Sequence, residues 1–145
     1  MKKFLLLLAL NSVLLTGCRI APEPIDYGSD ACHFCSMTIV DRQHGAELVT
    51  KKGKTFKFDA SECMMNHLKE VGSDKVALFL VNDYNTPGEL IDATAATYLI
   101  SQDIPSPMGE FLSAFQNKKD AETTKEEHGG DLFSWQELVL RFGNK

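Results

Sequence analysis

The pattern of apolar and polar positions separates an apolar leader from two runs of short elements. Four stretches of the first run are β-prone or alternate as strands do: 37–40, 46–50, 55–58 and 76–81. Between the last two, a helix is expected from about Ala60 to Gly72. Asp59 or Ser61 can cap its N-terminus. We assign this run the order β-β-α-β.

The same order recurs after a turn-rich junction at 82–88. The elements expected there are strands at 97–101, 110–115 and 132–133, a polar helix at 118–128 and an amphipathic helix at 135–142. We therefore predict an α+β fold of two similar small β-β-α-β halves. Each half is small for an independent core, so we expect the halves to pack together or to depend on a metal.

The leader has the features of a secretory signal peptide. Lys2 and Lys3 precede an apolar run from Phe4 to Leu15, which is shorter than the ~20 residues that a spanning helix needs. The run ends at Leu-Thr-Gly-Cys18, which resembles the bacterial lipobox, where the cysteine is acylated and becomes the new N-terminus. A plain signal peptide with an incidental cysteine, or a short N-terminal anchor, would be the alternatives.

Acylation at Cys18 would anchor the protein stably, because two or three acyl chains act together on one residue. The segment that follows contains Pro22 and Pro24 and has the composition of an extended tether. The predicted boundaries are 1–17 for the signal peptide, 18–29 for the lipidated tether, 30–84 for the first half and 85–145 for the second. The domain would lie on the cell membrane or outer membrane, facing the periplasm or the cell exterior, where disulfides are permitted.

Composition and charge exclude several functions. Of 145 residues, 24% are charged and 43% hydrophobic, which is an ordinary globular balance. Removing Lys2 and Lys3 leaves 13 basic against 20 acidic residues, a net charge of −7, so a nucleic-acid partner is not expected. The chain has no nucleophile elbow, no phosphate loop and no carboxylate pair whose spacing points to acid–base catalysis.

Sulfur chemistry gives the strongest local signal, in the run Cys-His-Phe-Cys-Ser-Met at 32–37. Cys32 and Cys35 have the spacing of two thiols that share a metal or close a redox disulfide. Met37 adds a thioether, and thiolate with thioether is a soft ligand set that favours Cu(I). Met37 is equally explained as an apolar residue at the start of a strand.

Two further sulfur groups lie elsewhere in the chain. Cys63 and His67 are four residues apart, so they share one face of the expected helix, although Cys63 is also a good core residue. Met108 lies in a loop bounded by proline and glycine, where core packing explains it poorly and function is common. The candidate metal ligands are thus Cys35, Met37, Met108, Cys32 and Cys63.

Two rival interpretations use the same cysteines. Cys32, Cys35, Cys63 and His67 form the spacing C-x2-C-x27-C-x3-H, which could hold a structural zinc ion. A thiol–disulfide enzyme could use Cys32 and Cys35, but such a motif normally opens a helix, and here it leads into a β-prone stretch. A lipid-anchored module without any ligand is a third possibility that composition leaves open.

Several motifs together resemble one known family. They are the lipobox, 35–39, 54–59 leading into Cys63, 106–109 with 111–115, and 126–130, and they follow the family's order over nearly all of the mature chain. They resemble the nitrous-oxide-reductase accessory lipoproteins, the NosL family. The resemblance implies a Cu(I)-binding copper chaperone, built from two similar β-β-α-β halves and without catalysis of its own. Cys35 and Met37 match the family's Cys-x-Met signature, and Met108 matches its Pro-Met-Gly loop.

The resulting hypothesis is a membrane-anchored, extracytoplasmic Cu(I)-binding protein that delivers copper to a cuproenzyme. The resemblance names nitrous oxide reductase or its assembly machinery as the client. The predicted partners are the membrane, through acylated Cys18, and the copper-receiving protein, with no nucleic acid. Zinc is the alternative metal.

Overall fold

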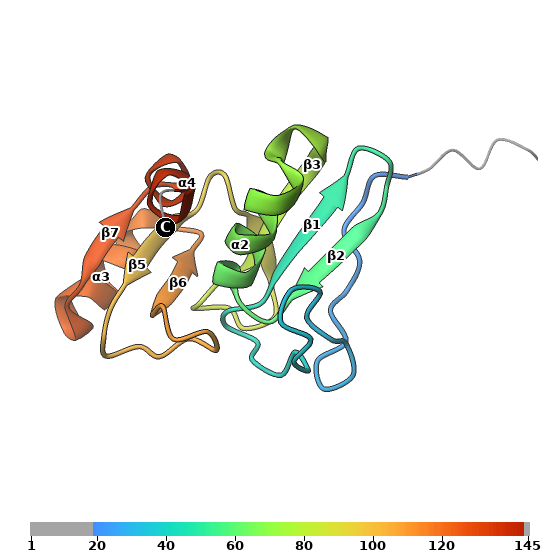
Figure 1. The fold of residues 1–145 in the computed structure, drawn as a ribbon. Helices are drawn as coiled ribbons and strands as arrows, with labels where there is room; N and C mark the ends of the chain where they lie inside the picture. The colour runs from blue at the N-terminus through green and yellow to red at the C-terminus, as the bar shows by residue number, and fades with distance from the viewer. Residues whose placement is uncertain (1–18, 144–145) are drawn as a thin grey trace, which may run out of the picture.

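A computed structural model of the protein describes residues 19–143, so the predicted signal peptide and Cys18 lie outside the described residues. The labels follow Figure 1. In chain order the elements are β1 (Ala46–Thr50), β2 (Thr55–Phe58), α2 (Ser61–Val71), the 3-10 turn η2 (Ser73–Lys75), β3 (Val76–Asn82), β4 (Leu90–Asp92), β5 (Thr97–Ile100), β6 (Leu112–Phe115), α3 (Lys118–His128), β7 (Asp131–Phe133) and α4 (Trp135–Gly143).

The strands form two antiparallel sheets with a repeated arrangement (Figure 1). The first sheet has the order β2-β1-β3-β4 and the second the order β6-β5-β7. In each sheet the first strand of a β-β-α-β unit is central, and the second and third strands flank it. The prediction of an α+β fold is confirmed, and the shared strand order supports its description as two similar halves.

Two local predictions near the first helix are wrong. The stretch 37–40 is not a strand; Thr38 alone forms an isolated bridge, with Ala31, because this part of the chain closes a tight loop on itself. Neither Asp59 nor Ser61 caps α2, since the N-cap residue is Ala60 and no side chain bonds the helix end. The carboxylate of Asp59 is buried among sulfur atoms instead, as described below.

The short strand β4 was not expected at all. Its three residues follow the turn-rich junction, and Ile91 pairs with Val81 of β3. A run of only two apolar residues has no periodicity of its own, so it is a strand only because β3 offers it a free edge. β4 thus belongs by sequence to the second predicted half and by hydrogen bonding to the first sheet.

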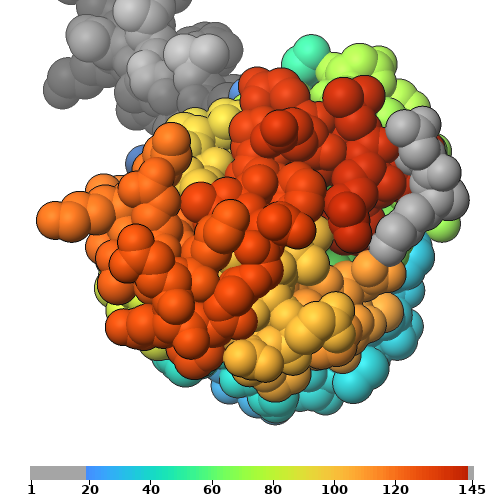
Figure 2. Space-filling view, turned by 90° about the vertical axis from the view of Figure 1, so that its left-hand side faces the viewer, coloured from blue at the N-terminus to red at the C-terminus, as the bar shows by residue number. Residues whose placement is uncertain are grey.

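A shared hydrophobic core joins the two halves. Its main cluster contains residues from both sheets and from the last helix, among them Leu48, Met64, Tyr98, Leu112 and Leu138, which are at most 1% exposed. A smaller cluster of Leu99, Ile104, Phe115 and Ala121 lies under α3. Figure 2 looks onto the second half and shows α4, in red, across the top, beside the green first half whose α2 it contacts.

The segment expected as a tether is packed against the first sheet over residues 23–30, which we call the strap. Ile25 is buried, and the Glu23 N–H donates to Glu47 Oε1 of β1 at 2.9 Å. Lys57 of β2 donates to the carbonyl of Pro24 at 2.7 Å and pairs with Asp30 at 2.7 Å. The strap therefore fixes where the chain enters the domain. Within residues 19–143, no helix is long and apolar enough to cross a membrane.

Candidate metal centre

Residues 30–39 form a tight cysteine loop. The Cys32 N–H donates to the Met37 carbonyl at 2.7 Å, and the Ser36 N–H donates to the Cys32 carbonyl at 2.9 Å. Ser36 has φ 64°, a left-handed conformation that non-glycine residues adopt rarely and that is common where a site imposes its own geometry. The His33 N–H bonds the Lys57 carbonyl at 2.8 Å, which fastens the loop to the end of β2.

Four side chains converge beneath this loop, and we call them the thiol cluster: Cys32, Cys35, Asp59 and Cys63. Their ligand atoms, three sulfurs and a carboxylate oxygen, all lie within 4.8 Å of one another. Asp59 follows β2 directly, and Cys63 lies in the first turn of α2. Cys35 is half-buried and the other three are buried, so the cluster opens to solvent on the Cys35 side.

The buried carboxylate of Asp59 is the clearest sign of a missing partner. Asp59 is 2% exposed, and neither of its oxygens has a hydrogen bond of ordinary geometry. Burying a carboxylate without a partner is costly, and such an orphaned group in a folded protein points to an ion that binds there. A cation would also offset the charge of the neighbouring thiolates, so the residues present fit a metal ion.

The three thiols differ in their readiness to ionise. A hydrogen bond from the Cys63 thiol lowers the pKa of Cys32 to about 6; burial opposes this, and backbone N–H groups of Cys35 and Asp59 add to it. The pKa of Cys63 is raised because its proton is held against the Cys32 sulfur and because it is buried. Burial likewise raises the pKa of Cys35. Cys32 is therefore the first thiolate to form.

The structure brings three of the five predicted ligands, Cys32, Cys35 and Cys63, together in the thiol cluster. Met37 lies in the cysteine loop, where its N–H donates to the Cys35 sulfur, but its side chain is 55% exposed. Met108 is half-buried in the second half and packs against the main core. The assignment of Met37 and Met108 as ligands stays a prediction.

His67 does not join the thiol cluster, so the Cys3His set expected for zinc is not the one assembled; Asp59 occupies that role. The His67 ring packs against His33 at 4.9 Å and against Phe56 and Phe58 at 5.2 and 5.4 Å between centroids. Burial and the nearby His33 lower the pKa of His67. The arrangement also differs from a thioredoxin-like dithiol, because Cys32 and Cys35 lie in a loop rather than at a helix N-terminus.

The sequence analysis gave Asp59 the wrong role, that of a helix N-cap. Aspartate just before a helix is ordinarily a capping residue, and the sequence offers no other signal for it. Only the fold shows that the carboxylate is turned away from the helix end and toward the thiols.

Comparison with known proteins decides the family, because the NosL family model matches residues 25–141. The chain belongs to the NosL family. Over 148 aligned residues it is 29% identical to the copper-binding lipoprotein NosL of Stutzerimonas stutzeri, covering 92% of this chain and 78% of the relative. The resemblance seen in the motifs is thereby confirmed.

A solved structure gives the same answer for the fold. The crystal structure of the copper chaperone NosL from Shewanella denitrificans superimposes with a TM-score of 0.74 at 26% identity, covering 85% of this chain and 98% of that one. The names of both NosL relatives describe copper binding or copper chaperoning, not catalysis. The expectation that this NosL-family protein is not an enzyme is confirmed on that ground.

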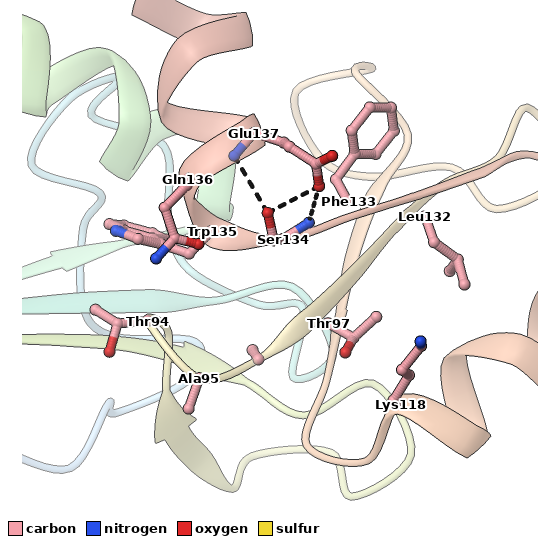
Figure 3. A pocket seen from close by; sticks show the side chains of 11 residues that line it. Thr94, Ala95, Thr97, Lys118, Leu132, Phe133, Ser134, Trp135, Gln136 and Glu137 are labelled. Carbon is pink, nitrogen blue, oxygen red and sulfur yellow. Dashed lines mark hydrogen bonds between the residues drawn. The ribbon is translucent and has the colours of Figure 1, made fainter.

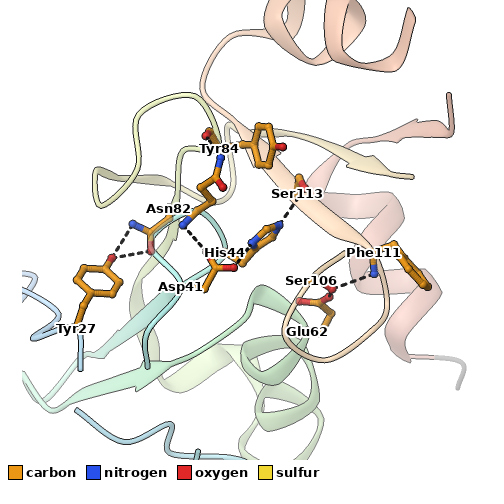
Figure 4. A network of polar contacts seen from close by, with 10 residues as sticks. Tyr27, Asp41, His44, Glu62, Asn82, Tyr84, Ser106, Phe111 and Ser113 are labelled. Atoms are coloured by element: carbon orange, nitrogen blue, oxygen red, sulfur yellow. Dashed lines mark hydrogen bonds and ion pairs between the residues drawn. The ribbon is translucent and has the colours of Figure 1, made fainter. Parts of the chain in front are cut away.

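A polar network links the two halves of the NosL fold (Figure 4). His44 bonds Asp41 at 2.9 Å and, through its other ring nitrogen, the Ser113 hydroxyl of β6 at 3.2 Å. This Asp-His-Ser row has the order of a catalytic triad, but Ser113 is 1% exposed, so no substrate reaches it. The row is a structural link between the halves.

A second link of the network lies next to the metal centre (Figure 4). The Ser106 hydroxyl donates to the carboxyl group of Glu62, whose pKa is raised by burial. Ser106 Oγ in turn accepts the Phe111 N–H at 2.9 Å. Glu62 precedes Cys63 in α2, so this contact holds the loop that contains Met108 against the start of the helix that carries Cys63.

A surface hollow of the second half lies between the start of β5, β7 and the start of α4 (Figure 3). It encloses about 420 Å³ near the start of α4. Two charged residues line it: Lys118 pairs with Glu122 at 3.6 Å, and Glu137 accepts bonds from the Ser134 N–H at 2.7 Å and the Ser134 hydroxyl at 2.8 Å. These bonds form a capping box for α4, and no cysteine, histidine or methionine lines the hollow.

Proposed function

We propose that this NosL-family protein is a membrane-anchored, extracytoplasmic Cu(I) carrier that delivers copper to a cuproenzyme. The client proposed is nitrous oxide reductase or its assembly machinery, as the family resemblance implies. The observation that carries the metal-binding part is the thiol cluster with its buried carboxylate, which faces the thiols and has no hydrogen bond of ordinary geometry. The relative from Stutzerimonas stutzeri is named a copper-binding lipoprotein, which supports both the cargo and the anchor.

The cysteine thiolates would supply the strongest bonds to copper. Cys35 is half-buried and borders solvent, so it is the sulfur that an arriving or departing ion meets first. Cys32 ionises most readily, and it would supply the first negative charge. Cys63 lies deeper, at 0% exposure, where it also serves the core. Soft sulfur ligands favour Cu(I) over oxygen-preferring cations.

Met37 and Met108 are proposed as the exchangeable ligands. A thioether is neutral and binds Cu(I) weakly, which suits a protein that must release its ion to a partner. Met37 follows Cys35 by two residues and is exposed enough to swing toward the cluster. The bond between Ser106 and Glu62 keeps the Met108 loop beside the start of α2, so the second half can contribute a ligand from there.

Zinc is the second candidate, and Asp59 is the observation that favours it. Three thiolates and one carboxylate make a four-coordinate set that zinc accepts. A zinc ion held this way would be structural, because a closed site leaves no position for exchange. In that case Met37 and Met108 would have no part in binding.

Competitive metal titration tests the proposal. The reduced full chain is titrated anaerobically with Cu(I) against a chelator, and then with Cu(I) and Zn(II) together at neutral pH. We expect Cu(I) to displace Zn(II) because all three cysteine ligands are soft. Retention of Zn(II) against equimolar Cu(I) would show that the site is a structural zinc site.

The anchor has its own test. If Cys18 is the lipidation site, Cys18→Ser should stop acylation and either release the domain or leave an unprocessed precursor. Mass spectrometry of the mature N-terminus measures this, with Cys35→Ser as the control that leaves the acyl chains in place. A wild-type N-terminus without acyl groups would contradict the proposed anchor.

A further inference from the structure

Five exposed lysines gather at one end of the first half, and we call them the lysine platform: Lys51, Lys52, Lys54, Lys69 and Lys75. The first three lie on the turn between β1 and β2, and the others at the end of α2 and just before β3. The Lys51 N–H donates to the Lys75 carbonyl at 2.9 Å, so these segments are fastened together. Glu70 and Asp74 are the acidic side chains of the same segments, which leaves the platform positive in a chain whose net charge is −5.

The described chain begins at this same end. Figure 1 shows its blue start beside the turn between β1 and β2, from where it runs along the sheet into the cysteine loop at the opposite end. The strap then fixes the chain through the bond from Glu23 to Glu47. Glu23 lies five positions after position 18, a span of at most about 18 Å when extended. Because position 18 directly precedes the described start, a lipid on Cys18 would lie near this end of the domain.

We propose that the lysine platform rests on the anionic headgroups of the bilayer into which Cys18 is anchored. This proposal rests on the lipid anchor proposed above. Lysines near an anionic leaflet are attracted to it and strengthen the hold of an acyl anchor, but only within about one Debye length, ~8 Å at physiological salt. Position 18 directly precedes the start of the described chain, which Figure 1 shows beside the turn that carries the first three platform lysines, and this supplies that closeness.

The consequence is a fixed orientation of the metal centre. β2 runs from Thr55, beside the platform, to Phe58, beside Asp59, a length of about 13 Å at the usual rise of a strand. α2 covers its 11 residues in about 16 Å, with Cys63 at the start and Lys69 near the far end. With the platform on the lipid, the thiol cluster faces away from the membrane, where a copper-receiving protein can approach it.

An acidic partner protein is a less suitable occupant, because the platform lies where the anchor brings the bilayer and away from the thiol cluster. Such a partner would have to enter the narrow space beneath the domain. A partner protein bound at the platform would also be too far from the metal centre to take up its ion. All five residues of the platform are positively charged lysines, which an anionic lipid surface attracts.

Lysine labelling on vesicles tests the proposed contact. The acylated, metal-free full chain is reconstituted into phosphatidylcholine vesicles with or without about one-third phosphatidylglycerol. Labelling of each lysine by a membrane-impermeant amine reagent is then followed by mass spectrometry. We expect platform lysines to react on the order of fivefold more slowly with phosphatidylglycerol present, and Lys118, Lys119 and Lys125 of α3 to be unaffected. High salt should remove the protection.

Charge-reversal variants provide the matched comparison. Lys51→Glu, Lys52→Glu and Lys75→Glu together should abolish the protection of Lys69, whereas Lys118→Glu, Lys119→Glu and Lys125→Glu, with the same charge change, should leave it intact. Lys54 is kept in both, because its Nζ lies 4.5 Å from the Phe56 ring centre and supports the hairpin. Both variants should bind Cu(I) as the wild type does, because neither set contains a proposed ligand.

The outcomes separate the two proposals. Equal labelling of platform and α3 lysines on an acylated chain, or protection that persists without phosphatidylglycerol, would overturn the platform and leave the copper site standing. Protection that survives the platform reversal would overturn it as well. A chain that carries no acyl group and leaves the vesicles would overturn the anchor and the platform together.

Discussion

The two halves of this protein have the same junction between their second strand and first helix, but only the first junction gathers candidate metal ligands among the described residues. β2 ends at Phe58 and α2 begins at Ser61; β6 ends at Phe115 and α3 begins at Lys118. The strand and the helix are thus separated by two residues in each half. Both phenylalanines are 0% exposed, so the core holds the end of each strand in the same way. In the first half the positions that follow are Asp59 and Cys63. Their counterparts in the second half are Gln116, which is exposed, and Asp120.

What differs is the chain that covers the junction. The cysteine loop closes over the first junction, adds two thiols and removes Asp59 from solvent. No such loop precedes β5, and α3 buries only Ala121 and Thr124. The comparison shows that a repeated scaffold does not create the site by itself. A covering segment, and the burial that it imposes, turn an ordinary strand–helix junction into the candidate metal centre.

The largest expected effect comes from removing the sulfur of Cys35, the ligand on the open side of the thiol cluster. Cys35→Ala should lower Cu(I) affinity by at least ~100-fold, because it deletes an anionic soft ligand at the open side of the cluster. Chelator competition measures the affinity. Gln116→Ala, in the equivalent junction of the second half, is the control and should bind copper as the wild type does. Wild-type affinity in Cys35→Ala would remove the cysteine loop from the proposed site.

Replacing the thioethers tests whether the second half contributes a ligand. Met37→Leu and Met108→Leu keep the side-chain shape and lose the sulfur, so each should weaken Cu(I) binding by roughly tenfold while the melting temperature is kept. Both are measured on the same preparations. If Met108→Leu binds as the wild type does and Cys32→Ala or Cys63→Ala does not, the site lies wholly on the thiol cluster and our ligand assignment is wrong.

Neutralising the buried carboxylate should separate stability from binding. Asp59→Asn replaces a buried carboxyl group that has no hydrogen bond of ordinary geometry, so the metal-free protein should gain about 1–3 kcal/mol in its free energy of unfolding, while metal affinity falls. Gln116→Glu, at the exposed counterpart, should stay within about 0.5 kcal/mol of the wild type. Denaturant titration with and without metal measures both. A loss of stability in metal-free Asp59→Asn would show that Asp59 has a structural partner instead.

The smallest effect is a pH dependence confined to the first half. The pKa of Cys32 is lowered to about 6 in the fold, below the ordinary thiol value of 9.0, so its ionisation favours the folded state. That contribution is fully present above the ordinary value and is lost as the pH falls through about 6. Thiolate absorbance of the metal-free protein should therefore appear with a midpoint near 6 and vanish in Cys32→Ala. A midpoint near that of a free thiol would contradict the assigned hydrogen bonds.

Local sequence patterns predicted most of the helices and strands, because the spacing of apolar residues shows which face of an element is buried. The strand at 55–58 and the polar helix at 118–128 occur at the predicted residues. The prediction is wrong where contacts between distant parts of the chain determine whether a segment is a strand. β4 exists only through the edge of β3, and 37–40 is drawn out of the expected strand by the closure of the cysteine loop.

The sequence by itself determined the kind of chemistry and the family. Thiols and thioethers at these spacings indicate a soft metal, and the ordered motifs carried the NosL resemblance. Tertiary structure decided which of those atoms meet. Cys63 is 28 residues from Cys35 in sequence, and Asp59 had the pattern of a capping residue, yet burial beneath one loop makes them neighbours. Spacing along a chain constrains only near neighbours, whereas the contact between distant side chains depends on how the whole core packs.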